Sequence, residues 1–266
     1  MLDRFNRKIN YLRISVTDRC NLRCVYCMPE EGIKWIEHNK IITYEEIIDI
    51  VKIGISLGID KFRITGGEPL IRKGIVDLIQ MISTIKGIKD LALTTNGILL
   101  EQYAEKLAKA GLHRINISLD TINPEKFSKL TRGGDVNAVI KGIKAAQIAG
   151  LSPVKINCVI HNNSLEEDAL TVNKYCIENG LQVRFIHQMN LSEGSFAVVE
   201  GGTGGDCENC NRLRITSNAK IKPCLFSDVE YDIRTLGIEK AFEMALNTKP
   251  EKGAQNKINY FNNIGG

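Results

Sequence analysis

This sequence of 266 residues lacks several features that would mark a specialised class of protein. Six prolines are too few for a collagen-like chain, and no run of about 18 uninterrupted apolar residues predicts a membrane span. The N-terminal MLDRFNRKINYLRIS has no apolar core of the kind found in signal peptides. The net charge of +4 is too small to indicate nucleic-acid binding by itself. We therefore expect a cytoplasmic globular protein without membrane or nucleic-acid partners.

Cysteine is the abundant exception, with eight residues. A disulfide framework is typical of short secreted chains, whereas clustered cysteines in a cytoplasmic protein usually bind metal or perform redox chemistry. Cys158 and Cys176 are isolated, and we expect them to be small buried side chains. The other six form two groups, which are Cys20, Cys24 and Cys27 near the start and Cys207, Cys210 and Cys224 near the end.

The first 190 residues alternate strand-like and helix-like patterns, which is typical of βαβ units and a parallel sheet. Six units favour an α/β fold built as a partial (β/α)6 TIM-type barrel, with a doubly wound sheet as the alternative. The expected strands are 11–17, 61–65, 90–95, 113–119, 154–160 and 182–186. The expected helices are 43–57, 72–85, 99–110, 124–130, 136–149 and 165–179. Thr43 followed by Glu46 is a capping-box signature for the first helix.

The rest of the chain has a different pattern. Residues 190–206 are rich in Gly and Ser and read as a loop, and 211–235 read as a hairpin around Ser217–Asn218–Ala219. A helix is expected over 235–247, followed by a polar tail. We therefore divide the chain into a barrel region, 1–190, and a small C-terminal region, 191–266.

The first cysteine group has the spacing C-x3-C-x2-C and directly follows the first expected strand. A zinc site needs four ligands, and the closest histidine is His38. Three thiolates on a four-iron cluster leave one iron open for the amine and carboxylate of a small molecule. The stretch TDRCNLRCVYCMP resembles the cluster motif of the radical S-adenosylmethionine (SAM) superfamily, including Tyr26 between the last two cysteines. That resemblance implies a [4Fe–4S] cluster that cleaves SAM.

The ends of the following strands agree with this resemblance. Catalytic residues of parallel barrels gather at the carboxyl ends of the strands. Glu68 of the GGEP stretch can accept from an ammonium group, and glycines allow close approach of a ligand. The resemblance implies SAM contacts at Tyr26, Gly66, Gly67, Glu68, Thr94, Thr95, Asn96, Ser118, Asn157 and Met189.

The second cysteine group has the spacing C-x2-C-x13-C, one cysteine short of a zinc ribbon. GDCENCNRLRITSNAKIKPCLFS resembles the C-terminal motif of the GTP 3′,8-cyclases of molybdenum cofactor biosynthesis (molybdenum cofactor biosynthesis protein A). The resemblance implies a second [4Fe–4S] cluster whose open iron binds the purine of GTP. A triphosphate needs several cations, and Arg offers a planar fork to each phosphate. The matching substrate positions are Arg13, Lys61, Arg63, Lys155, Arg184, Arg212 and Arg214, of which Arg212 and Arg214 are the expected catalytic residues.

The chain departs from the family between Met189 and Cys207, where only the 17 residues of 190–206 stand in place of several dozen. We expect a shortened C-terminal domain with less wall around the substrate. The family function is cyclisation of GTP; the alternative is a radical SAM enzyme with an auxiliary cluster that modifies a peptide or another phosphorylated purine. A reductant such as flavodoxin or ferredoxin and a homodimer are the expected partners. The family's terminal Gly-Gly, thought to enter the active site, corresponds to Gly265 and Gly266.

Overall fold

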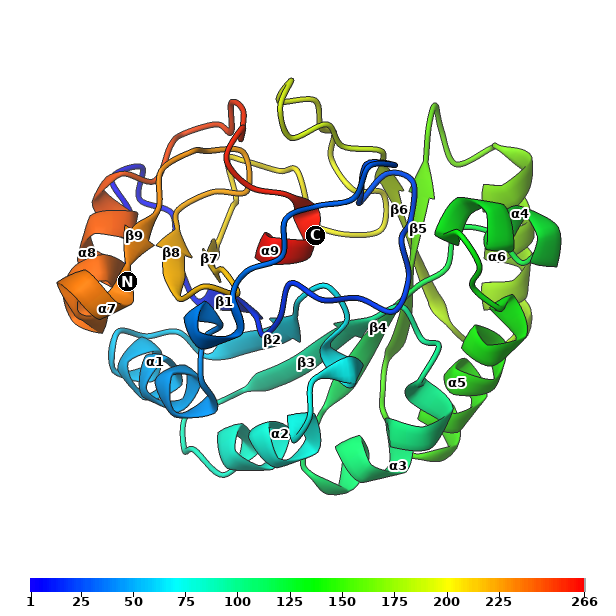
Figure 1. Ribbon diagram of the computed structural model, residues 1–266, viewed down its shortest axis with the longest axis horizontal. Helices are drawn as coiled ribbons and strands as arrows, with labels where there is room; N and C mark the ends of the chain where they lie inside the picture. The colour runs from blue at the N-terminus through cyan, green and yellow to red at the C-terminus, as the bar shows by residue number, and fades with distance from the viewer. Residues whose placement is uncertain (266) are drawn as a thin grey trace.

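A single curved sheet of nine strands forms the framework of the computed structural model, which describes residues 1–265. The strands lie in the order β6-β5-β4-β3-β2-β1-β7-β8-β9, and those from β6 to β7 are parallel. Figure 1 shows the sheet bending around an interior that contains loops and the C-terminal segment. The bounds are β1 Tyr11–Ser15, β2 Lys61–Thr65, β3 Asp90–Thr95, β4 Arg114–Ser118, β5 Val154–Ile160, β6 Gln182–His187, β7 Arg212–Ile215, β8 Lys220–Lys222 and β9 Tyr231–Asp232.

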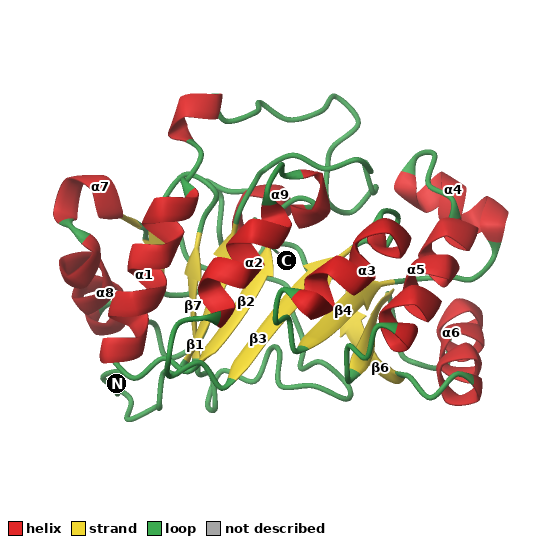
Figure 2. Ribbon diagram, turned by 90° about the horizontal axis from the view of Figure 1, so that it is seen from below, coloured by secondary structure: helices red, strands yellow, loops and turns green. Residues whose placement is uncertain are grey.

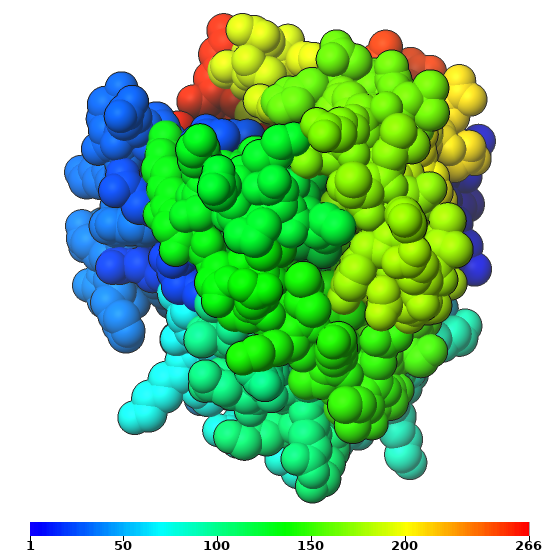
Figure 3. All heavy atoms as spheres, turned by 90° about the vertical axis from the view of Figure 1, so that its right-hand side faces the viewer, coloured from blue at the N-terminus to red at the C-terminus, as the bar shows by residue number. Residues whose placement is uncertain are grey.

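The helices cover the convex side of this sheet, as Figures 1 and 2 show. Figure 3 shows the surface that the green and yellow-green α4–α6 region forms on one side. A doubly wound sheet would reverse its strand order at a switch point and carry helices on both faces, so the order of β1 to β6 supports the open, barrel-type alternative. The bounds are α1 Tyr44–Ser56, α2 Ile75–Ser83, α3 Leu100–Lys109, α4 Pro124–Thr131, α5 Val136–Ile148 and α6 Glu167–Glu178, with 3-10 turns η1 His38–Lys40 and η2 Pro69–Ile71.

Alternation along the strands decides which side chains face inward. Leu12 and Ile14 of β1 are fully buried in the core beneath the helices, whereas Arg13 between them lines the concave side. The same alternation places Arg63 of β2 on the concave side between buried Phe62 and Ile64. Closed barrels of this type usually fill their interior with branched apolar residues. Polar inner positions leave a cavity here instead.

The predicted elements agree closely with those observed. Thr43 accepts from the backbone N–H of Glu46, whose carboxylate accepts from the N–H of Thr43, so the capping box is present. Cys158 and Cys176 are buried in β5 and α6, as expected. The second expected helix is shorter than 72–85, because Gly74 adopts a left-handed conformation and starts α2 at Ile75.

The C-terminal region continues the same sheet. β7 pairs with β1, and the predicted hairpin joins β7 to β8. The elements that follow are α7 Ile233–Leu236, α8 Ile238–Asn247 and α9 Phe261–Ile264. The sequence did not predict α9, which lies inside the curve of the sheet in Figure 1. Within residues 1–265, no helix has the length and apolarity that a membrane crossing requires.

Candidate functional site

A cavity of about 460 Å³ occupies the concave side of the sheet, a volume in the range of small-molecule sites. Both cysteine groups line it, together with side chains from the inner face of the barrel strands. The loop 190–206 also contributes, because Phe196, Val199 and Gly202 lie in its wall. Glu200 pairs with Phe185 on β6 through two backbone hydrogen bonds of 3.0 and 3.1 Å. The short connection therefore lines this edge of the cavity, and the expectation of less wall than in the family stays a prediction.

The first cysteine group lies in the loop that follows β1. The N–H groups of Cys27 and Met28 both donate to the carbonyl of Cys24 at 3.0 Å, which turns the chain and brings all three thiols to the cavity. Burial raises the pKa of Cys20 to about 11 and that of Cys24 to about 12, and it raises the pKa of Cys27 as well. Buried thiols ionise more readily beside positive charge, which the iron ions of an iron–sulfur cluster would supply.

The donor set fits a cluster better than a single ion. No three His, Cys, Asp or Glu side chains within residues 1–265 converge on a point that would hold one metal ion. Thiolates that hold a four-iron cluster bind separate irons and need not converge in this way. The residues present are therefore compatible with the cluster that the resemblance implies.

Gly66 and Gly67 make room for the segment that leads into the first cysteine group. A Cβ on Gly66 would lie 2.7 Å from the carbonyl oxygen of Thr17, and one on Gly67 would lie 2.2 Å from that of Arg19. Both distances are far below van der Waals contact, so no larger residue fits without moving the backbone. These glycines also line the cavity, but their tightest neighbours are protein backbone rather than open space.

Glu68 is 1% exposed, and its carboxylate is occupied within the protein. It accepts from the hydroxyl of Thr95 at 2.8 Å, from the N–H of Asn96 at 2.7 Å and from the N–H of Leu70 at 3.0 Å. Burial raises the pKa of Glu68 to about 7 although these three donors act to lower it. The carboxylate ties the end of β2 to the end of β3, and Glu68 is not among the residues that line the cavity.

The other expected SAM contacts line the cavity at the strand ends. Asn96 Nδ2 donates to Asn21 Oδ1 at 2.8 Å and lies 3.7 Å from the sulfur of Cys20. The hydroxyl of Tyr26 donates to Asp120 Oδ2 at 2.7 Å, which fixes the loop against β4. The remaining members are Thr94, Thr95, Ser118, Asn157 and Met189.

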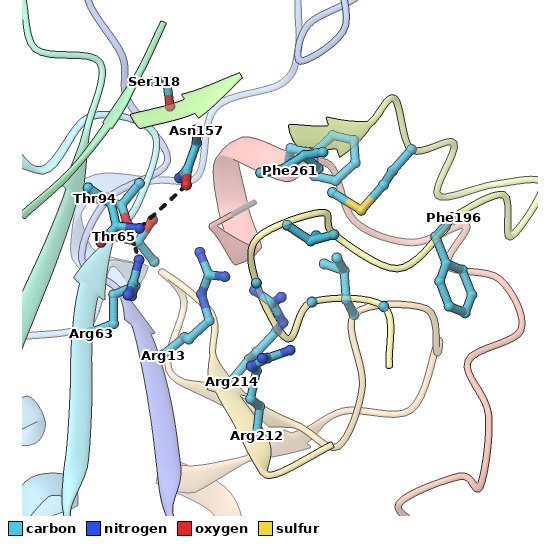
Figure 4. Close-up of a pocket in the computed structure, with 18 of the residues that line it drawn as sticks. Arg13, Arg63, Thr65, Thr94, Ser118, Asn157, Phe196, Arg212, Arg214 and Phe261 are labelled. Atoms are coloured by element: carbon cyan, nitrogen blue, oxygen red, sulfur yellow. Dashed lines mark hydrogen bonds between the residues drawn. The ribbon is translucent and has the colours of Figure 1, made fainter. Parts of the chain in front are cut away.

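Three arginines lie side by side on adjacent strands. The register pairs Arg13 of β1 with Arg63 of β2 on one side and with Arg214 of β7 on the other (Figure 4). Burial, followed by the positive charge of Arg214, lowers the pKa of Arg13 well below its usual range. Burial, followed by Arg212, lowers the pKa of Arg214 to about 10. Charges gathered this closely in a buried site favour an anion.

The hydrogen bonds that Arg63, Arg212 and Arg214 donate within the protein leave other N–H groups of these three side chains for a ligand. Arg63 donates to the hydroxyl of Thr94 at 3.1 Å, and Arg214 donates to the carbonyl of Gly265 at 2.6 Å. Arg212 donates to the hydroxyl of Thr203 in the 190–206 loop. The buried Nε atoms of Arg63 and Arg184 have no hydrogen-bond acceptor within residues 1–265. The acidic side chains among the lining residues are Asp90 and Asp206, and Asp90 is engaged by Arg114.

Cys207 and Cys210 of the second cysteine group precede β7, and Cys224 follows β8. Lys249 is buried and donates to the carbonyls of Arg212 and Pro223 at 2.8 and 2.7 Å. Burial would raise the pKa of Cys210, but the Lys249 ammonium, together with the charge and backbone N–H of Arg212, lowers that pKa. All three cysteines line the cavity, so both groups face one space.

Two predicted residues, Glu68 and Lys155, are not among the cavity-lining residues. Lys155 is nevertheless near Arg184: burial lowers the pKa of Lys155 most, and the positive charge of Arg184 lowers it further. Several lining residues were not predicted from the sequence. Arg114 could have been found, because it alternates inward on β4 with Asn116 and Ser118, whereas nothing in the tail marked Lys249. The lining residues that were missed include Tyr11, Thr65, Arg114, Asn116 and Lys249.

The C-terminal tail reaches the site through α9, whose residues Phe261 and Asn262 line the cavity. Asn262 donates to the carbonyl of Asp18 at 3.0 Å, and Ser217 donates to Asn263 Oδ1 at 2.6 Å. A Cβ on Gly265 would lie 2.2 Å from the side chain of Thr65, so this residue packs directly against β2. The second residue of the expected Gly-Gly pair, Gly266, lies outside the described residues.

Comparisons with known proteins agree with the motifs. A model of the radical SAM superfamily matches residues 14–176. A GTP 3′,8-cyclase of Alkaliphilus oremlandii (strain OhILAs) is 43% identical over 300 residues, covering 95% of this chain and 94% of the relative. A GTP 3′,8-cyclase of Peptoclostridium acidaminophilum is 43% identical over 277 residues, covering 88% and 85%. Because the first alignment is longer than this chain, that relative contains residues that the chain lacks.

Solved structures share the fold at lower identity. Native anSMEcpe with bound AdoMet aligns with a TM-score of 0.67 at 18% identity, over 92% of this chain and 82% of that chain. Streptococcus suis SuiB bound to S-adenosylmethionine aligns with a TM-score of 0.57 at 24% identity, over 69% of this chain and 41% of that one. At these identities the likeness supports the open-barrel fold and nothing finer.

Proposed function

Because this chain belongs to the radical SAM superfamily and, within it, to the GTP 3′,8-cyclase family, we propose that it converts GTP to (8S)-3′,8-cyclo-7,8-dihydroguanosine 5′-triphosphate. This reaction is the first step of molybdopterin biosynthesis. When bound, a reduced [4Fe–4S] cluster and SAM would supply the radical that removes the ribose C3′ hydrogen of GTP. C3′ would then bond to C8 of guanine, and one electron from the reductant and one proton from solvent would complete the dihydro product.

The cluster ligands follow from the two cysteine groups. Cys20, Cys24 and Cys27 would hold the cluster that binds SAM, and Cys207, Cys210 and Cys224 would hold a second cluster beside the substrate. Lys249 supports the second assignment, because its buried ammonium offsets the negative charge of thiolates. The proposed SAM contacts are Tyr26, Gly66, Gly67, Glu68, Thr94, Thr95, Asn96, Ser118, Asn157 and Met189.

The row of arginines is the observation that supports GTP most directly. Arg13, Arg63 and Arg214 occupy matched positions on three adjacent strands and face one cavity. A nucleoside triphosphate carries about four negative charges, and guanidinium groups bind phosphate oxygens through paired donors. Lys61, Lys155 and Arg184 would add to this site. Arg212 and Arg214 lie on β7, which runs between Cys210 and Cys224 in the sequence, and would hold GTP against the reacting centre.

The remaining expectations complete the proposal. Residues 1–190 would act as the radical SAM partial barrel and 191–266 as a shortened C-terminal region with an auxiliary cluster. A flavodoxin- or ferredoxin-type reductant would supply electrons in the cytoplasm, and the chain would act as a homodimer.

Anaerobic incubation with reductant, SAM and GTP, followed by mass spectrometry, tests the function. We expect 5′-deoxyadenosine and the cyclised triphosphate in equal amounts. Formation of 5′-deoxyadenosine without loss of GTP would reject the cyclase and retain the superfamily. Iron and sulfide analysis tests the cofactors, since two four-iron clusters require about eight irons per chain. Zinc without sulfide would exclude both clusters.

Variants test the substrate site. Arg212→Ala and Arg214→Ala should each abolish cyclisation while SAM binding persists, because their side chains lie on β7 and not among the proposed SAM contacts. Lys240→Ala, which removes an exposed charge on α8, is the matched control. Unchanged product formation in both arginine variants would reject the assigned substrate site.

A further inference from the structure

The loop that carries Cys24 and Cys27 rests on the last turn of α4. Two loop N–H groups donate to carbonyls of that turn, Arg23 to Thr131 at 3.1 Å and Val25 to Leu130 at 3.0 Å. Figure 1 shows the blue loop after β1 extending to the neighbourhood of α4. The end of this helix is therefore part of the support for the first cysteine group.

Arg132 closes this contact from the helix side. Its Nη1 donates to the carbonyl of Arg23 at 2.9 Å and to that of Met28 at 3.0 Å. These two carbonyls stand on either side of Cys24 and Cys27 in the sequence. One guanidinium therefore spans the segment that bears both thiols.

The backbone of Arg132 is unusual as well. It caps α4 in the left-handed region, with φ 55° and ψ 56°, where glycine is normally preferred. A glycine stands at the next position, Gly133, but Arg132 occupies the left-handed cap. The hydrogen bonds of the guanidinium to two carbonyls offset part of the conformational cost of this position.

We propose that Arg132 is a positioning residue for the first cluster, which fixes the spacing of Cys24 and Cys27 by holding the carbonyls at both ends of their segment. The inference rests on the proposed assignment of these cysteines to the cluster and is independent of GTP as the substrate. Two hydrogen bonds from a charged donor restrain the loop more than neutral bonds would. Loss of this restraint should increase the rate at which the cluster dissociates from the protein.

The test measures release of iron from the reconstituted holoenzyme to a chelator, together with the EPR signal of the reduced cluster that changes when SAM is added. Arg132→Gly and Arg132→Ala should release the SAM-responsive cluster about tenfold faster, the change expected for losing one or two charge-assisted bonds. Arg132→Lys should be intermediate, because one ammonium spans two carbonyls less well than a guanidinium. Lys129→Ala, which removes a charge from the same helix end, should match the wild type.

Arg132→Gly separates the guanidinium from the backbone, since glycine adopts the left-handed conformation freely. Its thermal unfolding should stay near that of the wild type, which excludes a general folding defect. Release from Arg132→Gly at the wild-type rate, or equal acceleration in Lys129→Ala, would overturn the proposal. Because no arm of this test contains GTP, a chain that fails to cyclise GTP could still confirm or refute the role of Arg132.

Discussion

Replacing Glu68 by glutamine should change the pH dependence of stability in a calculable way. Burial raises the pKa of this carboxyl from 4.5 to about 7. A raised pKa means that the folded protein disfavours the ionised form, so the wild type loses stability as pH rises through this window. The raised pKa lowers the free energy of unfolding by about 3 kcal/mol at pH values well above 7. About 2 kcal/mol of this loss occurs between pH 5.5 and pH 8.

Glutamine carries no charge and avoids this loss. It faces three donors with one acceptor oxygen, and its own NH2 group opposes at least one of them, which costs about 1–3 kcal/mol at every pH. Glu68→Gln should therefore be less stable than the wild type at pH 5.5 and approach or exceed it at pH 8. The difference in melting temperature should move by about 5 °C over this range.

Anaerobic thermal unfolding of both proteins at several pH values measures this, because other titrating groups are common to the two and cancel. Addition of SAM provides a functional arm. If the SAM ammonium lies beside Glu68, as proposed, SAM should raise the melting temperature of the wild type more than that of the variant at pH 8. A difference in melting temperature that is the same at pH 5.5 and pH 8 would refute the argument.

Three further predictions concern other parts of the molecule. Arg63→Gln should weaken GTP binding about 10- to 100-fold in equilibrium titrations, because a charge-assisted phosphate contact is lost, and it should weaken SAM binding much less, because only the bond to the Thr94 hydroxyl changes there. Lys249→Met should lower the reduction potential of the second cluster, on the order of tens of millivolts in an EPR titration, because a buried positive charge near Cys210 favours the added electron. Thr43→Ala should remove the cap of α1, cost about 1 kcal/mol in thermal unfolding and leave cyclisation intact, since only Glu46 and its neighbours lose contacts.

Local signals predicted most of the fold. The alternation in KFRIT and the Thr43 cap each depend on neighbours in sequence, so strands and helices were placed within a few residues. The pairing of β7 with β1 was not predictable, because Arg214 lies about 200 positions from its partner Arg13. α9 was missed for the same reason, since its polar residues are held by distant groups such as the carbonyl of Asp18.

The candidate site was predicted from motifs, and the structure adds side-chain and backbone contacts that the motifs do not contain. The GGEP stretch predicts glycines that allow a ligand to come close. The structure shows a second reason for Gly67, because a Cβ there would meet backbone atoms of Arg19. The ammonium contact of Glu68 stays a prediction, and the structure adds that its carboxylate also accepts from Thr95 and from two N–H groups. Sequence spacing places such residues at a strand end; it does not determine which neighbour takes each hydrogen bond.

The arginine row explains why the barrel is hollow and how it could bind a triphosphate. Burial lowers the pKa of Arg214 to about 10, which still leaves the guanidinium protonated at pH 7. The Arg214 charge is therefore present before any ligand arrives, and the free energy of burying it against the repulsion of Arg212 is supplied on folding by the apolar layer between sheet and helices. An anion that enters relieves this repulsion without needing to reorganise the site. Binding of a triphosphate beside Arg214 would thus gain free energy, because the fold already holds this positive charge in the cavity.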